Sequence, residues 1–78
     1  MSRLKSKIES LLFISAKPMT VRQIRRIIKK DEKEVRSAWD GLVESYKDNK
    51  NGVQIIKNGS KFQMVSSPEN TKLVQNFI

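Results

Sequence analysis

Residues 52–66 read GVQIIKNGSKFQMVS, and this stretch decides the fold. Apolar side chains are spaced two residues apart in each half, as they are on one face of a β-strand: Val53 with Ile55, and Phe62 with Met64. Asn58-Gly59 lies between the halves and is the pair that best adopts the positive φ angles of a type I′ turn. The pattern therefore predicts a two-stranded β-hairpin.

A helical pattern of apolar residues precedes the hairpin. Asp31 and Glu34 fit a capping box, in which two side chains satisfy free backbone N–H groups at a helix start. The apolar residues then recur at helical spacing: Val35, Ala38, Trp39, Leu42, Val43 and Tyr46. The turn formers Asp48-Asn49-Lys50-Asn51-Gly52 end the pattern. This is the clearest predicted helix, and we expect Trp39 to anchor the core from the middle of its apolar face.

Two shorter helices are predicted further toward the N-terminus. The first runs from about Arg3 to Ser15 and carries one apolar face, formed by Leu4, Ile8, Leu11 and Leu12. Pro18 helps to keep the chain from continuing as a helix. Thr20 with Gln23 repeats the capping-box pattern and starts the second helix. Its apolar face is formed by Val21, Ile24, Ile27 and Ile28.

The C-terminal residues predict one more helix after the hairpin. Ser67-Pro68 offers an N-cap followed by proline at the first helical position. The order helix, helix, helix, hairpin, helix is that of a winged helix-turn-helix domain, an α+β and mostly helical fold with a two-stranded β-hairpin wing. We expect residues 1–78 to form a single domain of this kind, because a chain of 78 residues has room for one small core.

Composition argues against an enzyme. The chain contains neither cysteine nor histidine, so it offers no disulfide, no usual zinc ligands and no histidine as general base. Its carboxylates lie mainly at helix starts, where capping and the helix dipole explain them, and its glycines form no phosphate-binding loop. We therefore expect no catalytic residue, cofactor, metal or small-molecule substrate. No apolar run approaches the roughly 20 residues that cross a bilayer, so we expect a cytoplasmic protein without a membrane partner.

The formal net charge of +8 is concentrated in the N-terminal part of the chain. Residues 1–30 hold nine Lys and Arg against one acid, whereas residues 31–78 hold seven of each sign. A basic stripe lies on the second predicted helix and two lysines flank the hairpin tip: Arg22, Arg25, Arg26 and Lys29, with Lys57 and Lys61. These residues are the candidates for nonspecific contact with a nucleic-acid backbone. The same charges also suit a surface that only keeps the domain soluble, and both interpretations stay open.

The start of the third predicted helix argues against sequence-specific reading of DNA. In helix-turn-helix proteins this segment approaches the base edges. Here it reads Asp31-Glu32-Lys33-Glu34, and phosphate would repel its carboxylates. Any contact with DNA is therefore expected to involve the backbone of the duplex rather than its bases.

Five apolar residues are candidates for a protein interface: Phe13, Leu73, Val74, Phe77 and Ile78. Phe13 points away from the apolar face of the first helix. It is therefore either covered by a loop or by the hairpin, or exposed in a patch of the kind that marks protein contacts. The four residues of the last helix cover a wide arc of its surface. They either complete the core or contact a continuation of the chain or a second copy.

Residues Ile8–Thr20 read IESLLFISAKPMT and resemble the opening of the ScpB family, which reads approximately I-E-A-L-L-F-x-S-x-x-P-L-S/T. The resemblance continues through Gly52–Ile55 and Phe62–Glu69, which are similar to the family's two wing strands and the following helix start. It thus covers nearly the whole chain. Net charge is the one departure, since typical members are acidic and this chain is basic.

The resemblance implies a non-enzymatic scaffold subunit of the condensin-like complex of SMC, the kleisin ScpA and ScpB, which acts in chromosome condensation and segregation. Members carry two winged-helix domains in tandem and form homodimers that clasp a central segment of ScpA. The first domain is associated mainly with dimerisation and the second with kleisin binding. If this holds here, Phe13 and the last helix are the places to look for subunit contacts, although the resemblance does not assign them. We expect residues 1–78 to be the first domain of a longer, nucleoid-associated parent protein. A DNA-binding winged-helix transcriptional regulator that uses the basic stripe and the wing is the alternative.

Overall fold

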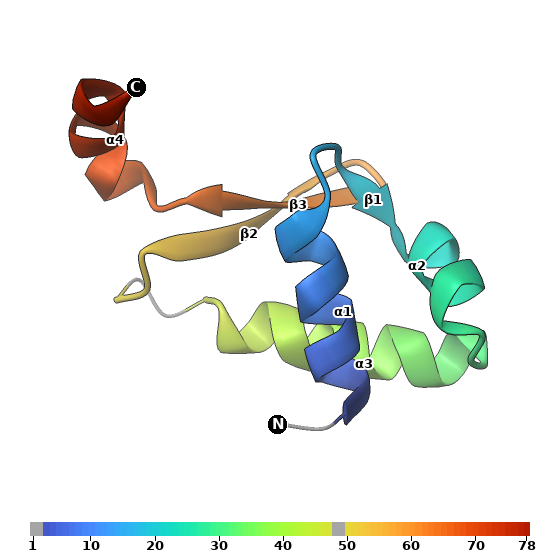
Figure 1. Cartoon of the computed structure of the whole chain (residues 1–78). Coiled ribbons are helices and arrows are strands. Elements are labelled where there is room, and N and C mark those ends of the chain that lie inside the picture. The colour runs from blue at the N-terminus through green and yellow to red at the C-terminus, as the bar shows by residue number, and fades with distance from the viewer. Residues whose placement is uncertain (1–2, 48–49) are drawn as a thin grey trace.

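Three packed helices, a small sheet and a separate C-terminal helix make up the computed structural model, which describes residues 3–47 and 50–78 (Figure 1). The elements follow the chain as α1 (Arg3–Ile14), β1 (Met19–Thr20), α2 (Val21–Ile28), α3 (Glu32–Ser45), β2 (Val53–Asn58), β3 (Lys61–Ser66), the 3₁₀ turn η1 (Pro68–Asn70) and α4 (Thr71–Phe77). This order confirms the predicted winged helix. The predicted turn residues Asp48 and Asn49 lie outside the described residues.

The core is formed by one face of each of α1, α2 and α3. Its buried apolar side chains in the described part of the chain are Ile8, Leu12, Val21, Ile24, Val35, Trp39 and Leu42. Trp39 is 1% exposed, which confirms its predicted place in the core. Its ring meets that of Phe62 edge to face, with 4.5 Å between the ring centroids and 77° between the ring planes. Burying a large apolar side chain contributes about 1.5–3 kcal/mol, so this contact holds the sheet against the helices.

One residue of the predicted apolar face of the second helix is not buried. Ile27 is exposed on α2, while Val21 and Ile24 are buried and Ile28 packs half-buried against the core. α2 has only eight residues and packs against α1 and α3 along one narrow row of side chains. Ile27 lies outside that row and is 54% exposed. The apolar spacing in the sequence therefore overestimates the width of the buried face.

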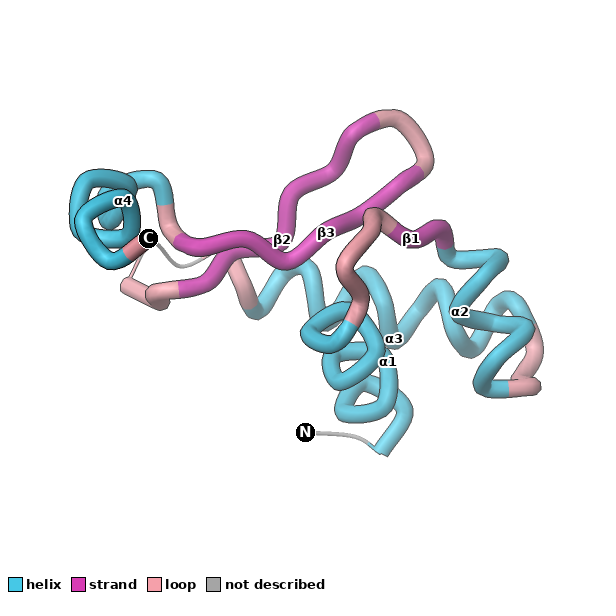
Figure 2. The backbone as a smooth tube through the Cα atoms, turned by 45° about the horizontal axis from the view of Figure 1, so that its top comes forward, coloured by secondary structure: helices cyan, strands magenta, loops and turns pink. Residues whose placement is uncertain are grey.

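The hairpin is part of a three-stranded antiparallel sheet with the strand order β1-β3-β2 (Figure 2). β2 pairs with β3 along the whole of both strands, which confirms the predicted hairpin. On the other side of β3, Met19 pairs with Phe62 and Thr20 with Lys61. The sequence does not predict β1, because two residues are too few to show a strand periodicity.

The turn of the hairpin differs from the predicted type. Asn58 pairs with Lys61, so Gly59 and Ser60 are the two central residues of the turn. Gly59 has a φ of 65°, and within the described residues Ser60 is not one of those with positive φ. A positive φ at the first central position alone is the type II′ arrangement, for which glycine is preferred. The predicted type I′ turn on Asn58-Gly59 is therefore wrong, and the turn lies one residue further along the chain.

Helix capping follows the prediction at α2 and departs from it at α3. The Thr20 hydroxyl oxygen accepts a hydrogen bond from the Gln23 backbone N–H at 3.1 Å, and Gln23 Oε1 accepts one from the Thr20 N–H at 2.9 Å. This reciprocal pair confirms the predicted capping box. Asp31 occupies the N-cap of α3, but its side chain makes no cap hydrogen bond, so the predicted box with Glu34 is wrong. The start of α3 is exposed, where water can satisfy its first N–H groups.

The predicted side-chain cap at Ser67 is also wrong. Ser67 is buried, and its backbone N–H donates to the Gly52 carbonyl at 2.8 Å. Its side chain makes no cap hydrogen bond. Pro68 takes the first position of η1, and α4 follows only from Thr71. Ser67 thus closes the open end of the hairpin instead of capping a helix.

The molecule is elongated, with extents of 42 × 22 × 22 Å. Figures 1 and 2 show α1, α2 and α3 below the sheet, with α4 beyond the end of the hairpin that is opposite its turn. α4 packs against η1 and contains no buried residue. None of the helices in residues 3–47 and 50–78 combines the length and apolarity that a membrane span requires.

Candidate functional site

The apolar residues of α4 and its C-cap form an exposed surface. Leu73, Phe77 and Ile78 are 70%, 91% and 94% exposed, and Val74 is half-buried. The interpretation that the last helix completes the core is therefore wrong. Contact of large apolar side chains with water is unfavourable, and exposed apolar patches mark sites of protein contact. We refer to Leu73, Val74, Phe77 and Ile78 as the α4 surface.

A second exposed apolar surface lies at the end of α1. Phe13 is 71% exposed and Ile14 is 77% exposed, so neither a loop nor the wing covers Phe13. A groove of about 240 Å³ begins beside it, lined by Glu9, Ser10, Phe13, Tyr46, Val53 and Met64. Ile14 is not among the interface residues predicted from the sequence. The signal that could have identified it is the apolar run Leu11–Ile14, because four consecutive apolar residues cannot all lie on one face of a helix. We refer to Phe13 and Ile14 as the α1 surface.

A hydrogen bond between α1 and the end of α3 lies in the wall of this groove. The Tyr46 hydroxyl donates to Glu9 Oε2. This hydrogen bond, burial of the ring and the negative charge of Glu9 together raise the pKa of Tyr46 to about 12. All three causes favour the neutral phenol, so Tyr46 stays a hydrogen-bond donor and holds the end of α3 to α1.

A basic cleft lies where α2, α3 and the hairpin turn meet. It has a volume of about 640 Å³. Its charged lining residues are Arg22, Glu32, Arg36 and Lys57, and its apolar ones are Val21 and Phe62. Lys57 Nζ lies 5.9 Å from the centroid of the Phe62 ring, within the range of a cation–π contact. We refer to these six residues as the basic cleft, and Arg36 is the member that the sequence pattern does not indicate.

The residues of the predicted basic stripe line two different hollows. Arg22 lies in the basic cleft together with the predicted wing residue Lys57. The other members line a separate, more open hollow beside Lys30 and Asp31: Arg25, Arg26 and Lys29. Lys29 is the C-cap of α2, in the left-handed conformation with a φ of 62° and a ψ of 46°. The basic stripe on α2 thus borders both the basic cleft and this second hollow.

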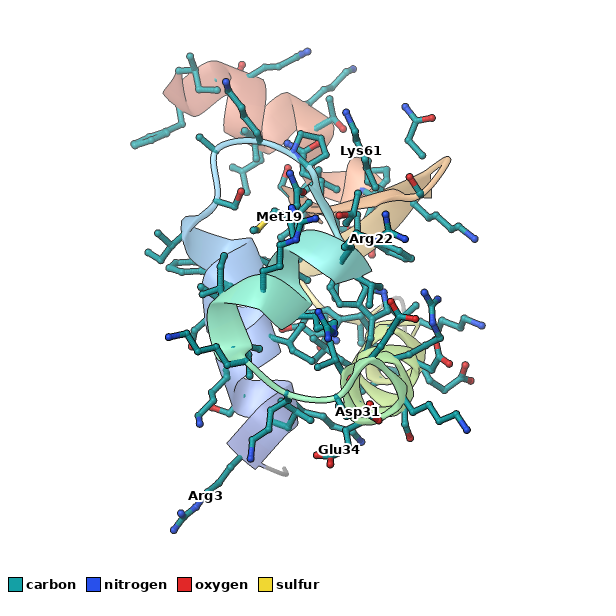
Figure 3. The ribbon with its side chains drawn as sticks, turned by 90° about the vertical axis from the view of Figure 1, so that its right-hand side faces the viewer. Arg3, Met19, Arg22, Asp31, Glu34 and Lys61 are labelled. Atoms are coloured by element: carbon teal, nitrogen blue, oxygen red, sulfur yellow. The ribbon has the colours of Figure 1, made fainter. Side chains whose placement is uncertain are left out.

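The acidic start of α3 lies largely apart from the basic cleft. Figure 3 shows Arg22 and Lys61 on the side where α2 meets the hairpin, and Asp31 and Glu34 near the opposite end of α2. Among the acids at the start of α3, Glu32 is the one that lines the cleft. An anion in the cleft therefore meets one carboxylate from the start of α3, rather than the three that the sequence places there. In residues 3–47 and 50–78 there is also no group of acidic side chains that could hold a metal ion.

Sequence comparison gives a family match over nearly the whole chain. Residues 6–78 match the family described as segregation and condensation complex subunit ScpB. The segregation and condensation protein B of Clostridium perfringens is 37% identical over 76 residues, which cover 96% of this chain and 39% of that relative. This chain therefore spans well under half of the relative's length.

Solved structures show the same fold. A dimer of the ScpB N-terminal domain complexed with an ScpA peptide matches with a TM-score of 0.82 and 20% identity, over 95% of this chain and 93% of that one. ScpB from Mycobacterium tuberculosis matches with a TM-score of 0.83 and 15% identity, over 95% of this chain and 46% of that one. At these identities the likeness is one of fold. Together with the sequence match over residues 6–78, it leads to the conclusion that this chain belongs to the ScpB family of segregation and condensation complex subunits.

Proposed function

We propose that this chain is a non-enzymatic scaffold domain of an SMC–ScpA–ScpB complex, which condenses and segregates bacterial chromosomes. It acts by forming a homodimer and by associating with an ScpA-like kleisin, and through the kleisin with SMC. The observation that carries the proposal is the α4 surface, because large apolar side chains held away from the core call for a partner. Membership of the ScpB family supports the choice of partners.

The exposed apolar area is large enough for a specific dimer. The α4 and α1 surfaces expose five large side chains: Phe13, Ile14, Leu73, Phe77 and Ile78. A phenylalanine offers on the order of 150 Å², and a leucine or isoleucine about 100 Å². Their sum of roughly 600 Å² per copy is a large part of the about 800 Å² that each partner contributes to a standard interface. A two-fold symmetric dimer that buries both surfaces thus has the size of a stable one.

We further propose that residues 1–78 form the first of two winged-helix domains of a longer, cytoplasmic and nucleoid-associated protein. Support comes from the length of the relatives, since the chain covers 39% of the Clostridium perfringens protein and 46% of the Mycobacterium tuberculosis chain. Further support comes from the likeness to an ScpB N-terminal domain that was solved as a dimer with an ScpA peptide.

Analytical ultracentrifugation of this chain tests the dimer. We expect the wild type to sediment as a dimer and Phe77→Glu as a monomer, because an unpaired carboxylate in an apolar interface is strongly unfavourable. Phe13→Glu tests the α1 surface in the same way. Ile27→Glu is the matched control, since Ile27 is an exposed apolar helix residue outside both surfaces. A wild-type chain that stays monomeric at all practical concentrations, with and without an ScpA peptide, would overturn the proposal.

The alternative function, a DNA-binding transcriptional regulator, has weaker support from this geometry. The cations of the predicted stripe are divided between two hollows, and Glu32 lies in one of them. Binding through these cations would weaken steeply as salt rises. The affinity for DNA should then be mostly lost when four cations are replaced by Gln: Arg22, Arg25, Arg26 and Lys29. Unchanged DNA binding in that variant would exclude the stripe as the contact surface.

A further inference from the structure

Cations from three different elements meet at the basic cleft. Arg22 comes from the first turn of α2, Arg36 from α3 and Lys57 from β2, next to the hairpin turn. All three are exposed, and within residues 3–47 and 50–78 none of them forms an ion pair with a carboxylate. Glu32 is the one acid in the lining of the cleft. Three cations gathered against one acid create a positive potential that favours an anionic ligand.

Two residues of the cleft lining are apolar. Val21 is buried, and Phe62 is half-buried with its ring held against Trp39. Lys57 Nζ lies 5.9 Å from the centre of the same Phe62 ring, so a cation and an aromatic ring are presented side by side. Binding sites of this kind combine apolar walls with a few polar groups that fix orientation. Cations and an aromatic ring in the same lining match a peptide in which a carboxylate lies next to an apolar side chain.

Duplex DNA matches the cleft less well. Its outer surface presents continuous rows of phosphates, which are held by cations and gain nothing from apolar side chains. Glu32 in the lining would face those phosphates. Of the other predicted nucleic-acid contacts, Arg25, Arg26 and Lys29 line a different hollow, and Lys61 is in the lining of neither. The observations therefore favour a short acidic peptide over a nucleic acid.

We infer that the basic cleft binds an acidic peptide segment of a protein partner. A carboxylate of the segment contacts Arg22, Arg36 and Lys57, and a neighbouring apolar side chain packs on Phe62 and Val21. This inference rests on the proposed function, since the segment belongs to the ScpA-like kleisin. The cleft shares no residue with the α4 surface or the α1 surface. Peptide binding and dimerisation therefore depend on different side chains.

Synthetic peptides that tile the ScpA sequence of the same organism test this inference, with binding followed by fluorescence anisotropy. The cleft variant carries Arg22→Gln, Arg36→Gln and Lys57→Gln. The matched control removes the same number of charges from the other hollow, through Arg25→Gln, Arg26→Gln and Lys29→Gln. We expect the wild type to bind peptides rich in Asp and Glu. The cleft variant should bind them about tenfold more weakly or worse, and the control less than about threefold more weakly.

Glu32→Gln adds a variant that is expected to gain affinity. It removes the one negative charge from the lining of the cleft while keeping the size of the side chain. Acidic peptides should bind about two- to threefold more tightly to it. Because the substituted residues are exposed, circular dichroism should show an unchanged fold in every variant. Unchanged or weaker peptide binding by Glu32→Gln would contradict the inference.

The outcomes separate the inference from the proposed function. Equal losses in the cleft and control variants would overturn the cleft as the binding site and leave the proposed function in place. The cleft is likewise excluded as the binding site if the wild type binds only neutral or basic ScpA peptides. If the wild type binds no ScpA peptide, the kleisin part of the proposed function fails together with the inference. If it then binds a short DNA duplex and the cleft variant does not, the cleft is a DNA contact.

Discussion

Trp39 joins the helical core to the sheet through its ring contact with Phe62. Its Nε1 has no hydrogen-bond partner in the described part of the chain, so packing alone explains its burial. Trp39→Ala should lower the free energy of unfolding by about 3–5 kcal/mol, a large part of the roughly 4–12 kcal/mol expected of a chain this short. Urea denaturation followed by circular dichroism measures the loss. The exposed neighbour provides the control, since Asp40→Ala should change stability by less than about 0.5 kcal/mol.

Tyr46 is the single tyrosine of the chain, so its titration can be followed directly by ultraviolet absorbance. We expect a midpoint near pH 12 in the folded chain, because the hydrogen bond to Glu9, burial and the charge of Glu9 all oppose the phenolate. Glu9→Gln should move the pKa down toward its ordinary value of about 10. Since folding raises this pKa, the stabilisation is fully present below pH about 10 and is lost as pH rises through about 12. An ordinary pKa in the wild type would mean that the contact is absent in solution.

The hairpin turn depends on the backbone conformation of Gly59. A Cβ would meet nothing within 4 Å at Gly59 or at Gly52, so space does not distinguish the two positions. Gly59→Ala should nevertheless destabilise the domain by about 1 kcal/mol, because an L-residue at a φ of 65° is strained. Gly52→Ala, at a position without positive φ, should be neutral or stabilise by up to about 1 kcal/mol. Thermal unfolding of both variants measures the difference, and equal shifts would contradict the assigned turn.

Elements with a periodicity of their own are predictable from the sequence, whereas those that depend on a distant partner are not. α3 and the hairpin strands carry their spacing within one short stretch. Met19 and Thr20 form a strand only because β3 lies beside them, and no local signal reports that neighbour. The turn differs from the prediction by one residue for a similar reason. Asn58 pairs with Lys61 across the hairpin, and both Asn58-Gly59 and Gly59-Ser60 suit a two-residue turn, so turn propensity alone does not decide between the two registers.

The candidate surfaces likewise differ in whether a local sequence signal reveals them. Phe13 and the apolar residues of α4 could be identified from the sequence, because a helical wheel places them off the local apolar face or across too wide an arc. Arg36 could not, since an exposed arginine on a helix is ordinary. Its place beside Arg22 and Lys57 follows from the packing of α2, α3 and the wing. Along α2, the sequence spacing likewise does not indicate that the residues of the basic stripe line two different hollows.

At the scale of the whole molecule, α4 is separable from the rest of the fold. It contributes no buried residue and lies beyond the end of the hairpin (Figure 1). A chain shortened to residues 1–70 should therefore melt within about 4 °C of the full chain, when both are compared as monomers at low concentration. The shortened chain should also fail to dimerise in sedimentation experiments. Loss of the folded state on shortening would show that α4 supports the core.

Thr20 belongs to two parts of the molecule at once. Its hydroxyl caps α2, and its position in β1 pairs with Lys61 of the hairpin. In mechanical terms, the wing and the second helix therefore form one stiff unit, since no flexible joint separates them. A pull on the hairpin tip is transmitted to the first turn of α2, and a pull on α2 is resisted by the sheet. A partner that exerts force on the hairpin or on α2 thus transfers that force to the helical core.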